Sequence, residues 1–126
     1  MDTNRELLHK DLSYKIVGLA MQIHSELGFG FLEKVYENSM MVLFRRENIM
    51  AKQQAPVSVS FEGEIVGDYY ADILIEDKII LELKAIEKIT DAHKAQALNY
   101  LKASGLKLAI IINFGKQRLE YERIVL

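Results

Sequence analysis

The chain has 126 residues, of which 50% are apolar and 27% are charged, and its formal net charge at pH 7 is −2. This length and balance predict one globular domain, residues 1–126, with a substantial apolar core. The sequence contains no cysteine, which excludes disulfides, thiolate zinc sites and cysteine nucleophiles. The slight acidity counts against a nucleic-acid binder, because such domains are usually basic overall, but a local basic patch would outweigh it.

Neither a membrane span nor a signal peptide is apparent in the sequence. The apolar run at residues 108–112 has the length of a strand and is far shorter than a membrane span. The first six residues are mostly polar and lack the hydrophobic stretch of a secretory signal. We therefore expect a cytoplasmic protein that does not interact with membranes.

Two helices are predicted in the first part of the chain. Thr3 and Glu6 form a capping-box pattern at the start of the first helix, whose apolar residues recur every three or four positions. The Gly-Phe-Gly sequence at residues 28–30 ends it, and a second helix is expected over residues 31–47, with Asn48 as a left-handed stop. The buried side of the second helix is expected to comprise Leu32, Val35, Tyr36, Met40, Leu43 and Phe44.

After residue 50 the period of the apolar pattern changes to two, which indicates strands. Turns are expected at residues 62–63 and 76–78, so the first three strands form an antiparallel meander. The elements expected are strands 57–61, 65–75 and 79–86, a helix over residues 90–103 begun by Thr90 and ended by Gly105, a doubly buried strand 106–114, and strand 119–126. The order ααβββαββ predicts an α/β fold with a mixed sheet flanked by helices.

Acidic residues on two neighbouring strands would be brought together by the second turn. Asp72 lies on one strand, and Glu82 and Lys84 project from one face of the next. Two adjacent carboxylates cost stability unless a cation lies between them, and a hard divalent metal is the usual solution. With the backbone carbonyl of Leu83 as a further ligand, Mg²⁺ would keep positions for a substrate phosphate and an attacking water. Lys84 would hold that water or neutralise charge on the phosphoryl oxygens, so the pattern indicates phosphodiester hydrolysis.

Other interpretations fit the same residues. Alternating charged and apolar residues also occur on any half-exposed antiparallel strand. Glu33 is either a further ligand that orients a metal-bound water or a solvated residue favoured by the helix dipole. His93, Gln96 and Tyr100 fall at i, i+3 and i+7, and this stripe either contacts phosphate, base or catalytic water or is a polar helix edge.

The segment Gly30-x-x-Glu33-x-x-Tyr36 resembles the signature of the GxxExxY family of small bacterial and archaeal proteins. The resemblance extends over nearly the whole chain, including residues 23–30, 70–75, 81–85, 93–102 and 112–115. This family is assigned to the PD-(D/E)XK nuclease superfamily, whose core is a helix, a three-stranded meander, a helix and a further strand. The resemblance therefore implies a restriction-endonuclease-like core.

The resemblance also implies roles for individual residues. Asp72 and Glu82 would be metal ligands, and Lys84 the catalytic cation. Glu33 would be the acid of the N-terminal helix, while Gln96 and Tyr100 would be a supporting pair, similar to the Q-x-x-x-Y element of RecB-type nucleases. Ala71 replaces the proline that names the superfamily, a change that touches no ligand.

These observations predict a nuclease dependent on Mg²⁺ or Mn²⁺ that hydrolyses DNA or RNA. The alternative is a non-catalytic nucleic-acid or protein binding module that retains the nuclease fold. A third interpretation, a hydrolase of smaller phosphoesters, would require a closed pocket. Because so small a domain covers little duplex, we expect either a homodimer or recruitment by a protein partner.

Overall fold

The computed structural model describes residues 8–126, and their elements follow the predicted order ααβββαββ. The capping box expected at Thr3 and Glu6 lies outside the described residues. The elements are helices α2 (Lys10–Leu27) and α3 (Glu33–Arg46), strands β1 (Ala51–Phe61), β2 (Glu64–Ile75) and β3 (Ile79–Lys84), helix α4 (Asp91–Ser104), and strands β4 (Leu108–Asn113) and β5 (Glu120–Val125).

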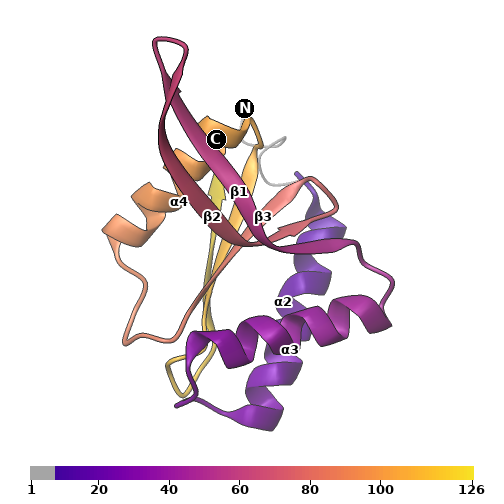
Figure 1. The fold of residues 1–126 in the computed structure, drawn as a ribbon. Helices are drawn as coiled ribbons and strands as arrows, with labels where there is room; N and C mark the ends of the chain where they lie inside the picture. Colours follow the sequence, from indigo (N-terminus) through magenta and orange to yellow (C-terminus); the bar gives the residue numbers. More distant parts are fainter. Residues whose placement is uncertain (1–7) are drawn as a thin grey trace.

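The five strands form one mixed sheet in the order β1-β2-β3-β4-β5. β1, β2 and β3 are an antiparallel meander, α4 crosses over to place β4 parallel to β3, and β5 returns antiparallel to β4. Figure 1 shows α4 on one side of the sheet and α2 and α3 on the other, with the β1–β2 hairpin extending beyond these layers. Across residues 8–126 no helix is both long and apolar enough to cross a membrane.

The central strands are buried on both faces because each separates two apolar clusters. All six residues of β4 are buried. Leu108, Ile110 and Ile112 pack with α2 and α3, whereas Ala109 and Ile111 pack with α4. This arrangement confirms the prediction of a doubly buried strand and explains why the sequence there is apolar without alternation.

The start of β1 differs from the prediction. The strand begins at Ala51 rather than at Val57. The prediction began too late because the polar residues 52–54 interrupt the period-two pattern. Pro56 consequently lies in the middle of the strand. It is tolerated there because β1 is at the edge of the sheet, where no further strand requires its missing N–H.

The apolar face of α3 is also narrower than predicted. Leu32 precedes the helix as its N-cap and is 81% exposed, and Val35 is 37% exposed. Tyr36, Met40 and Phe44 are fully buried, so the helix packs on these positions. Leu32 and Val35 instead contribute to the surface around the start of α3.

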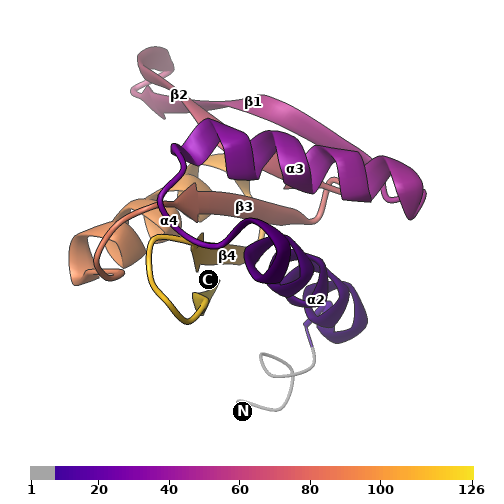
Figure 2. The same cartoon turned by 90° about the horizontal axis from the view of Figure 1, so that it is seen from below.

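The segment after β3 is held by the chain that follows β4. Asn113 is fully buried, and its side-chain amide accepts a hydrogen bond from Ile86 N and donates one to Ile86 O, each 3.0 Å long. At Gly115, an added Cβ would lie only 2.3 Å from Ile86 N. In Figures 1 and 2 the β4–β5 loop also lies beside the α2–α3 loop. Three segments far apart in the sequence thus meet at the end of β3.

We predict that Gly115→Ala destabilises the protein by about 1–3 kcal/mol, the usual cost of overpacking, because the new Cβ meets backbone atoms that cannot rotate away. Urea denaturation measures the difference. The control is Gly18→Ala, where the added Cβ meets nothing within 4 Å and helix propensity favours alanine by up to about 1 kcal/mol. Equal stability of the two variants would contradict the close approach at Gly115.

Candidate functional site

β2 and β3 separate at two carboxylates. Their pairing ends at Ile73 and Leu81. Immediately beyond, Asp72 N donates a hydrogen bond of 2.9 Å to Glu82 Oε2, and Leu83 N donates one of 2.7 Å to Asp72 Oδ2. Each carboxylate therefore accepts an N–H that a continued ladder would have satisfied with a carbonyl. The two acids predicted to meet are brought together at the base of a fork between the strands.

A local distortion of the hairpin positions Asp72. Residues two apart on a strand normally share a face, yet Ile73 and Ile75 pack with α2 and α3 whereas Ala71 packs with α4. The strand thus changes the face it presents at Asp72. On the neighbouring strand, Gln54 has a φ of 54° and interrupts the pairing with β2. Such irregularities in a sheet redirect side chains, and this one directs the Asp72 carboxylate into the fork.

Burial gives the fork unusual acid–base properties. Glu82 is 6% exposed, and burial followed by the nearby Asp72 charge raises the pKa of its carboxyl from 4.5 to about 8. Burial is also the largest cause raising the pKa of Asp72, and the charges of Glu37 and Glu33 add to it. The Lys84 charge opposes both pKa shifts, so its ammonium lies within electrostatic range of both acids. Near neutral pH the fork therefore favours binding a proton or a cation.

The donor atoms of the fork fit a hard divalent ion. Within residues 8–126 no three His, Cys, Asp or Glu side chains are placed to hold a metal, so the side chains contribute two carboxylates. The N–H of Leu83 points to Asp72, and because the N–H and C=O of a strand residue point the same way, the Leu83 carbonyl also faces the fork. Few oxygen ligands and room for waters are typical of Mg²⁺, and Mn²⁺ accepts the same donors.

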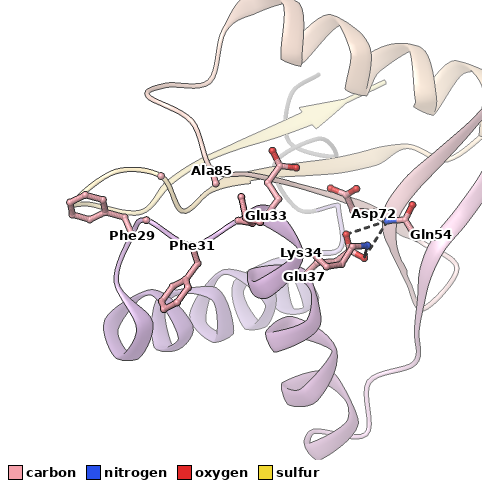
Figure 3. A pocket seen from close by; sticks show the side chains of 11 residues that line it. Phe29, Phe31, Glu33, Lys34, Glu37, Gln54, Asp72 and Ala85 are labelled. Atoms are coloured by element: carbon pink, nitrogen blue, oxygen red, sulfur yellow. Dashed lines mark hydrogen bonds and ion pairs between the residues drawn. The ribbon is translucent and has the colours of Figure 1, made fainter.

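Asp72 also lines a pocket of about 670 Å³ beside α3. Glu33 and Glu37, one turn apart on α3, line the same pocket, while Phe29 and Phe31 lie at its other end in Figure 3. Glu33 is exposed at the first turn of α3. The structure therefore places the predicted acid Glu33 near Asp72, in an acidic pocket reached from solvent.

Glu37 was not predicted as a site residue. Although acidic, it is only 4% exposed, and its carboxylate accepts hydrogen bonds from Lys34 Nζ at 3.0 Å, Gln53 Nε2 at 2.5 Å and Gln54 Nε2 at 3.2 Å. Its position four residues after Glu33 was the available signal, because such residues share a helix face. Through its bond with Gln54, Glu37 connects α3 to β1 at the residue that lies opposite Asp72 in the hairpin.

Tyr36 holds the loop that forms one wall of this acidic pocket. Its hydroxyl donates to Gly28 O at 2.7 Å and accepts from Phe31 N at 3.3 Å. Its ring is fully buried and stacks on Phe114, with centroids 4.4 Å apart and planes inclined by 11°. Gly30 in the same loop has a φ of 113°, a conformation that favours glycine. Gly30 and Tyr36 therefore shape the loop, whereas Glu33 faces the pocket.

The predicted pair on α4 lies on the other side of the fork. Gln96 Nε2 donates to Tyr100 OH at 3.2 Å. Burial, then the charges of Glu82 and Asp72, raise the pKa of Tyr100, so this phenol lies within electrostatic range of the fork and stays protonated at neutral pH. His93, the third residue of the predicted stripe, accepts the Thr90 N–H at its Nδ1 at 2.9 Å and completes a capping box.

Comparison with known proteins identifies the superfamily. A family model described as the PD-(D/E)XK nuclease superfamily matches residues 10–124, and the chain belongs to this superfamily. Its mixed five-stranded sheet with flanking helices is accordingly a restriction-endonuclease-like fold.

A solved structure titled "Crystal structure of SSO0001" is similar to the chain, with a TM-score of 0.56 and 19% identity. The match covers 73% of this chain and 48% of that one, so this chain spans about half the length of that protein. At this identity the likeness shows the fold alone. No curated protein matches the sequence.

We predict that without metal the free energy of unfolding decreases as the pH rises from about 5 to about 8. The raised pKa of Glu82 means that its contribution is fully present below the unfolded pKa of 4.5 and is lost as the pH passes the folded value of about 8. Glu82→Gln should therefore be more stable than the wild type at pH 8 in EDTA, with little difference at pH 4.5. Parallel pH profiles in urea denaturation would contradict this, and exposed Glu64→Gln is the control.

We predict that Tyr36→Phe lowers the free energy of unfolding by about 0.5–1.5 kcal/mol for each lost hydrogen bond and speeds amide exchange at Phe31. The ring and its stacking on Phe114 remain, so the change isolates the hydroxyl. Denaturation and NMR hydrogen exchange measure these effects. Tyr14→Phe is the control because Tyr14 is 84% exposed. Unchanged exchange at Phe31 would show that the hydroxyl does not hold the loop.

Proposed function

We propose that this protein is a divalent-metal-dependent nuclease of the GxxExxY type, which hydrolyses phosphodiester bonds in DNA or RNA. The observation that carries the proposal is the pair of the half-buried Asp72 and the buried Glu82, each of which accepts a backbone hydrogen bond where β2 and β3 separate. Membership of the PD-(D/E)XK nuclease superfamily supports it. The spacing of Gly30, Glu33 and Tyr36 supports the assignment to GxxExxY proteins. So do the places of Gly30 and Glu33 in the lining of the acidic pocket and the hydrogen bonds by which Tyr36 holds the loop of that pocket.

The carboxylates of Asp72 and Glu82 and the carbonyl of Leu83 would hold Mg²⁺ or Mn²⁺. When bound, such an ion polarises a phosphoryl oxygen and lowers the pKa of a coordinated water. Lys84 follows these ligands on β3, and its charge acts on both carboxylates. In this proposal the Lys84 ammonium stabilises the negative charge that develops on the phosphoryl oxygens.

The remaining predicted residues would act from the two sides of the fork. Glu33, from α3, would orient a water on the side of the acidic pocket. On the α4 side, Tyr100 keeps its proton because its pKa is raised, so its hydroxyl can donate a hydrogen bond to a phosphate oxygen. Gln96 contacts that hydroxyl and would direct it. Substrate would therefore approach from the side of α4, which lacks the acids of α3.

A cleavage assay tests the proposal. We expect the wild type to cleave single-stranded or duplex DNA or RNA with Mg²⁺ or Mn²⁺ and to be inactive in EDTA. Asp72→Asn, Glu82→Gln and Lys84→Met should each lower the rate by about 100-fold or more, the cost of removing transition-state stabilisation.

The control is Asp68→Asn, an exposed acid on the same strand whose carboxylate accepts a hydrogen bond from Ser58. It should cleave at the wild-type rate. Cleavage that survives in the Asp72 and Glu82 variants would place the activity elsewhere. A wild type that binds nucleic acid and cleaves none of these substrates would identify a binding module instead.

A further inference from the structure

A second cavity, of about 1040 Å³, lies between the β1–β2 hairpin and α4. We call it the hairpin groove, and the side chains that matter most in it are Ser58, Ser60, Tyr69, Gln96, Asn99 and Tyr100. Figure 1 shows α4 beside the β1–β2 hairpin, whose tip extends beyond the end of the helix. The groove is distinct from the acidic pocket beside α3, with which it shares no lining residue.

The hairpin groove lies on the side of the sheet to which Glu82 projects. Gln96 and Tyr100 form part of its lining, and the Tyr100 phenol lies within electrostatic range of both Glu82 and Asp72. Glu82 projects from the same face of β3 as Ile80, which packs with Tyr100 in the core under α4. A strand bound in the groove would therefore lie on the same side of the sheet as Glu82, with Tyr100 between it and the fork.

The charges that line the two cavities differ, and those of the hairpin groove suit a polyanion better. Three carboxylates, those of Glu33, Glu37 and Asp72, and one ammonium, that of Lys34, line the pocket beside α3, which leaves it negative overall. None of the described residues that line the hairpin groove is acidic, and Lys102 contributes a positive charge. Hydroxyl and amide groups make up most of its other polar lining. A phosphate backbone is therefore repelled from the α3 side and accepted on the α4 side.

Tyr69 presents an aromatic surface in this groove. Its side chain is 48% exposed, and its ring centroid lies 5.8 Å from that of Tyr100, with the planes inclined by 40°. Gly67 leaves space for the ring, because an added Cβ there would lie 3.0 Å from it. The ring is thus supported by Tyr100 and Gly67 while part of it remains open to solvent, as in proteins that stack nucleic-acid bases on aromatic side chains.

We infer that the hairpin groove binds an unpaired nucleotide of the substrate strand, with its base stacked on Tyr69. The groove has the volume of a small-ligand pocket rather than of a duplex, and a paired, stacked base presents no free face to the ring. The amides of Asn99 and Gln96 then meet base edges or sugar hydroxyls. The inference rests on the proposed function and narrows its substrates to single strands, overhangs and frayed ends.

Binding experiments with Ca²⁺ in place of Mg²⁺ test this inference. The probes are fluorescent 12-nucleotide single strands of DNA and RNA and a blunt DNA duplex, with anisotropy as the readout. We expect tighter binding of a single strand than of the duplex, and a loss of roughly 10- to 100-fold for Tyr69→Ala, the range of one stacked base. Tyr69→Phe should keep the affinity within about 2-fold, whereas Tyr69→Leu should lose it.

A spectroscopic signature distinguishes stacking from a merely structural role. A 2-aminopurine placed in the strand should be quenched by the wild type and by Tyr69→Phe, and not by Tyr69→Ala or Tyr69→Leu. Tyr70→Ala is the matched control, since Tyr70 is 57% exposed on the same strand and does not line the groove. Melting curves confirm that each variant is folded.

The outcomes separate this inference from the proposed function. If cleavage depends on Asp72 but binding and quenching are unchanged in Tyr69→Ala, the nucleotide-binding role of the groove is wrong and the proposed nuclease activity stands. If binding depends on Tyr69 but no substrate is cleaved, the nucleotide-binding role of the groove stands and the proposed nuclease activity is wrong. Preference for the blunt duplex, or no binding of any probe by the wild type, would overturn the inference.

Discussion

At the point where β2 and β3 separate, carboxylates take over hydrogen bonds that carbonyls make elsewhere in the sheet. The Glu82 carboxylate accepts the N–H of Asp72, and the Asp72 carboxylate accepts the N–H of Leu83, the residue after Glu82. The two side chains thus hold the strands apart and hold each other in place. Burial of two neighbouring acids raises the pKa of both, and without a cation this costs stability. A sheet with apolar residues at these positions would be more stable, and such a sacrifice of stability is typical of a functional site.

The rest of the fold keeps this fork rigid and accessible. Asn113 fixes the segment that follows Lys84, and Gly115 allows the β4–β5 loop to approach that segment closely. On the side of α3, Tyr36 ties down the loop that borders the acidic pocket. On the side of α4, Gln96 and Tyr100 line the hairpin groove, and Tyr100 lies within electrostatic range of the fork. The fork therefore lies between the two layers of helices, and the charges that line the cavities on its two sides differ.

The type and order of the helices and strands could be predicted because the period of the apolar residues depends on which faces of an element are buried. The meeting of Asp72 and Glu82 also followed from local chemistry, since the short turn at residues 76–78 sets a register in which Ile73 pairs with Leu81. Features that depend on tertiary contacts were not predictable. Leu32 was predicted on the buried side of its helix and is exposed, whereas the acidic Glu37 is buried and bonded to glutamines of β1. The left-handed Gln54 likewise has no signal in the sequence, because nothing but its packing imposes that conformation.

The central claim is that the Asp72–Glu82 fork binds a divalent cation, and Mn²⁺ binding followed by electron paramagnetic resonance tests it without any assumption about substrate. Free Mn²⁺ is titrated with the wild type, with Asp72→Asn and with Asp68→Asn, up to millimolar metal. The fork predicts that the wild type and Asp68→Asn remove the signal of free Mn²⁺ equally and that Asp72→Asn does not. Equal binding by all three proteins, or no binding by any of them, would contradict the claim.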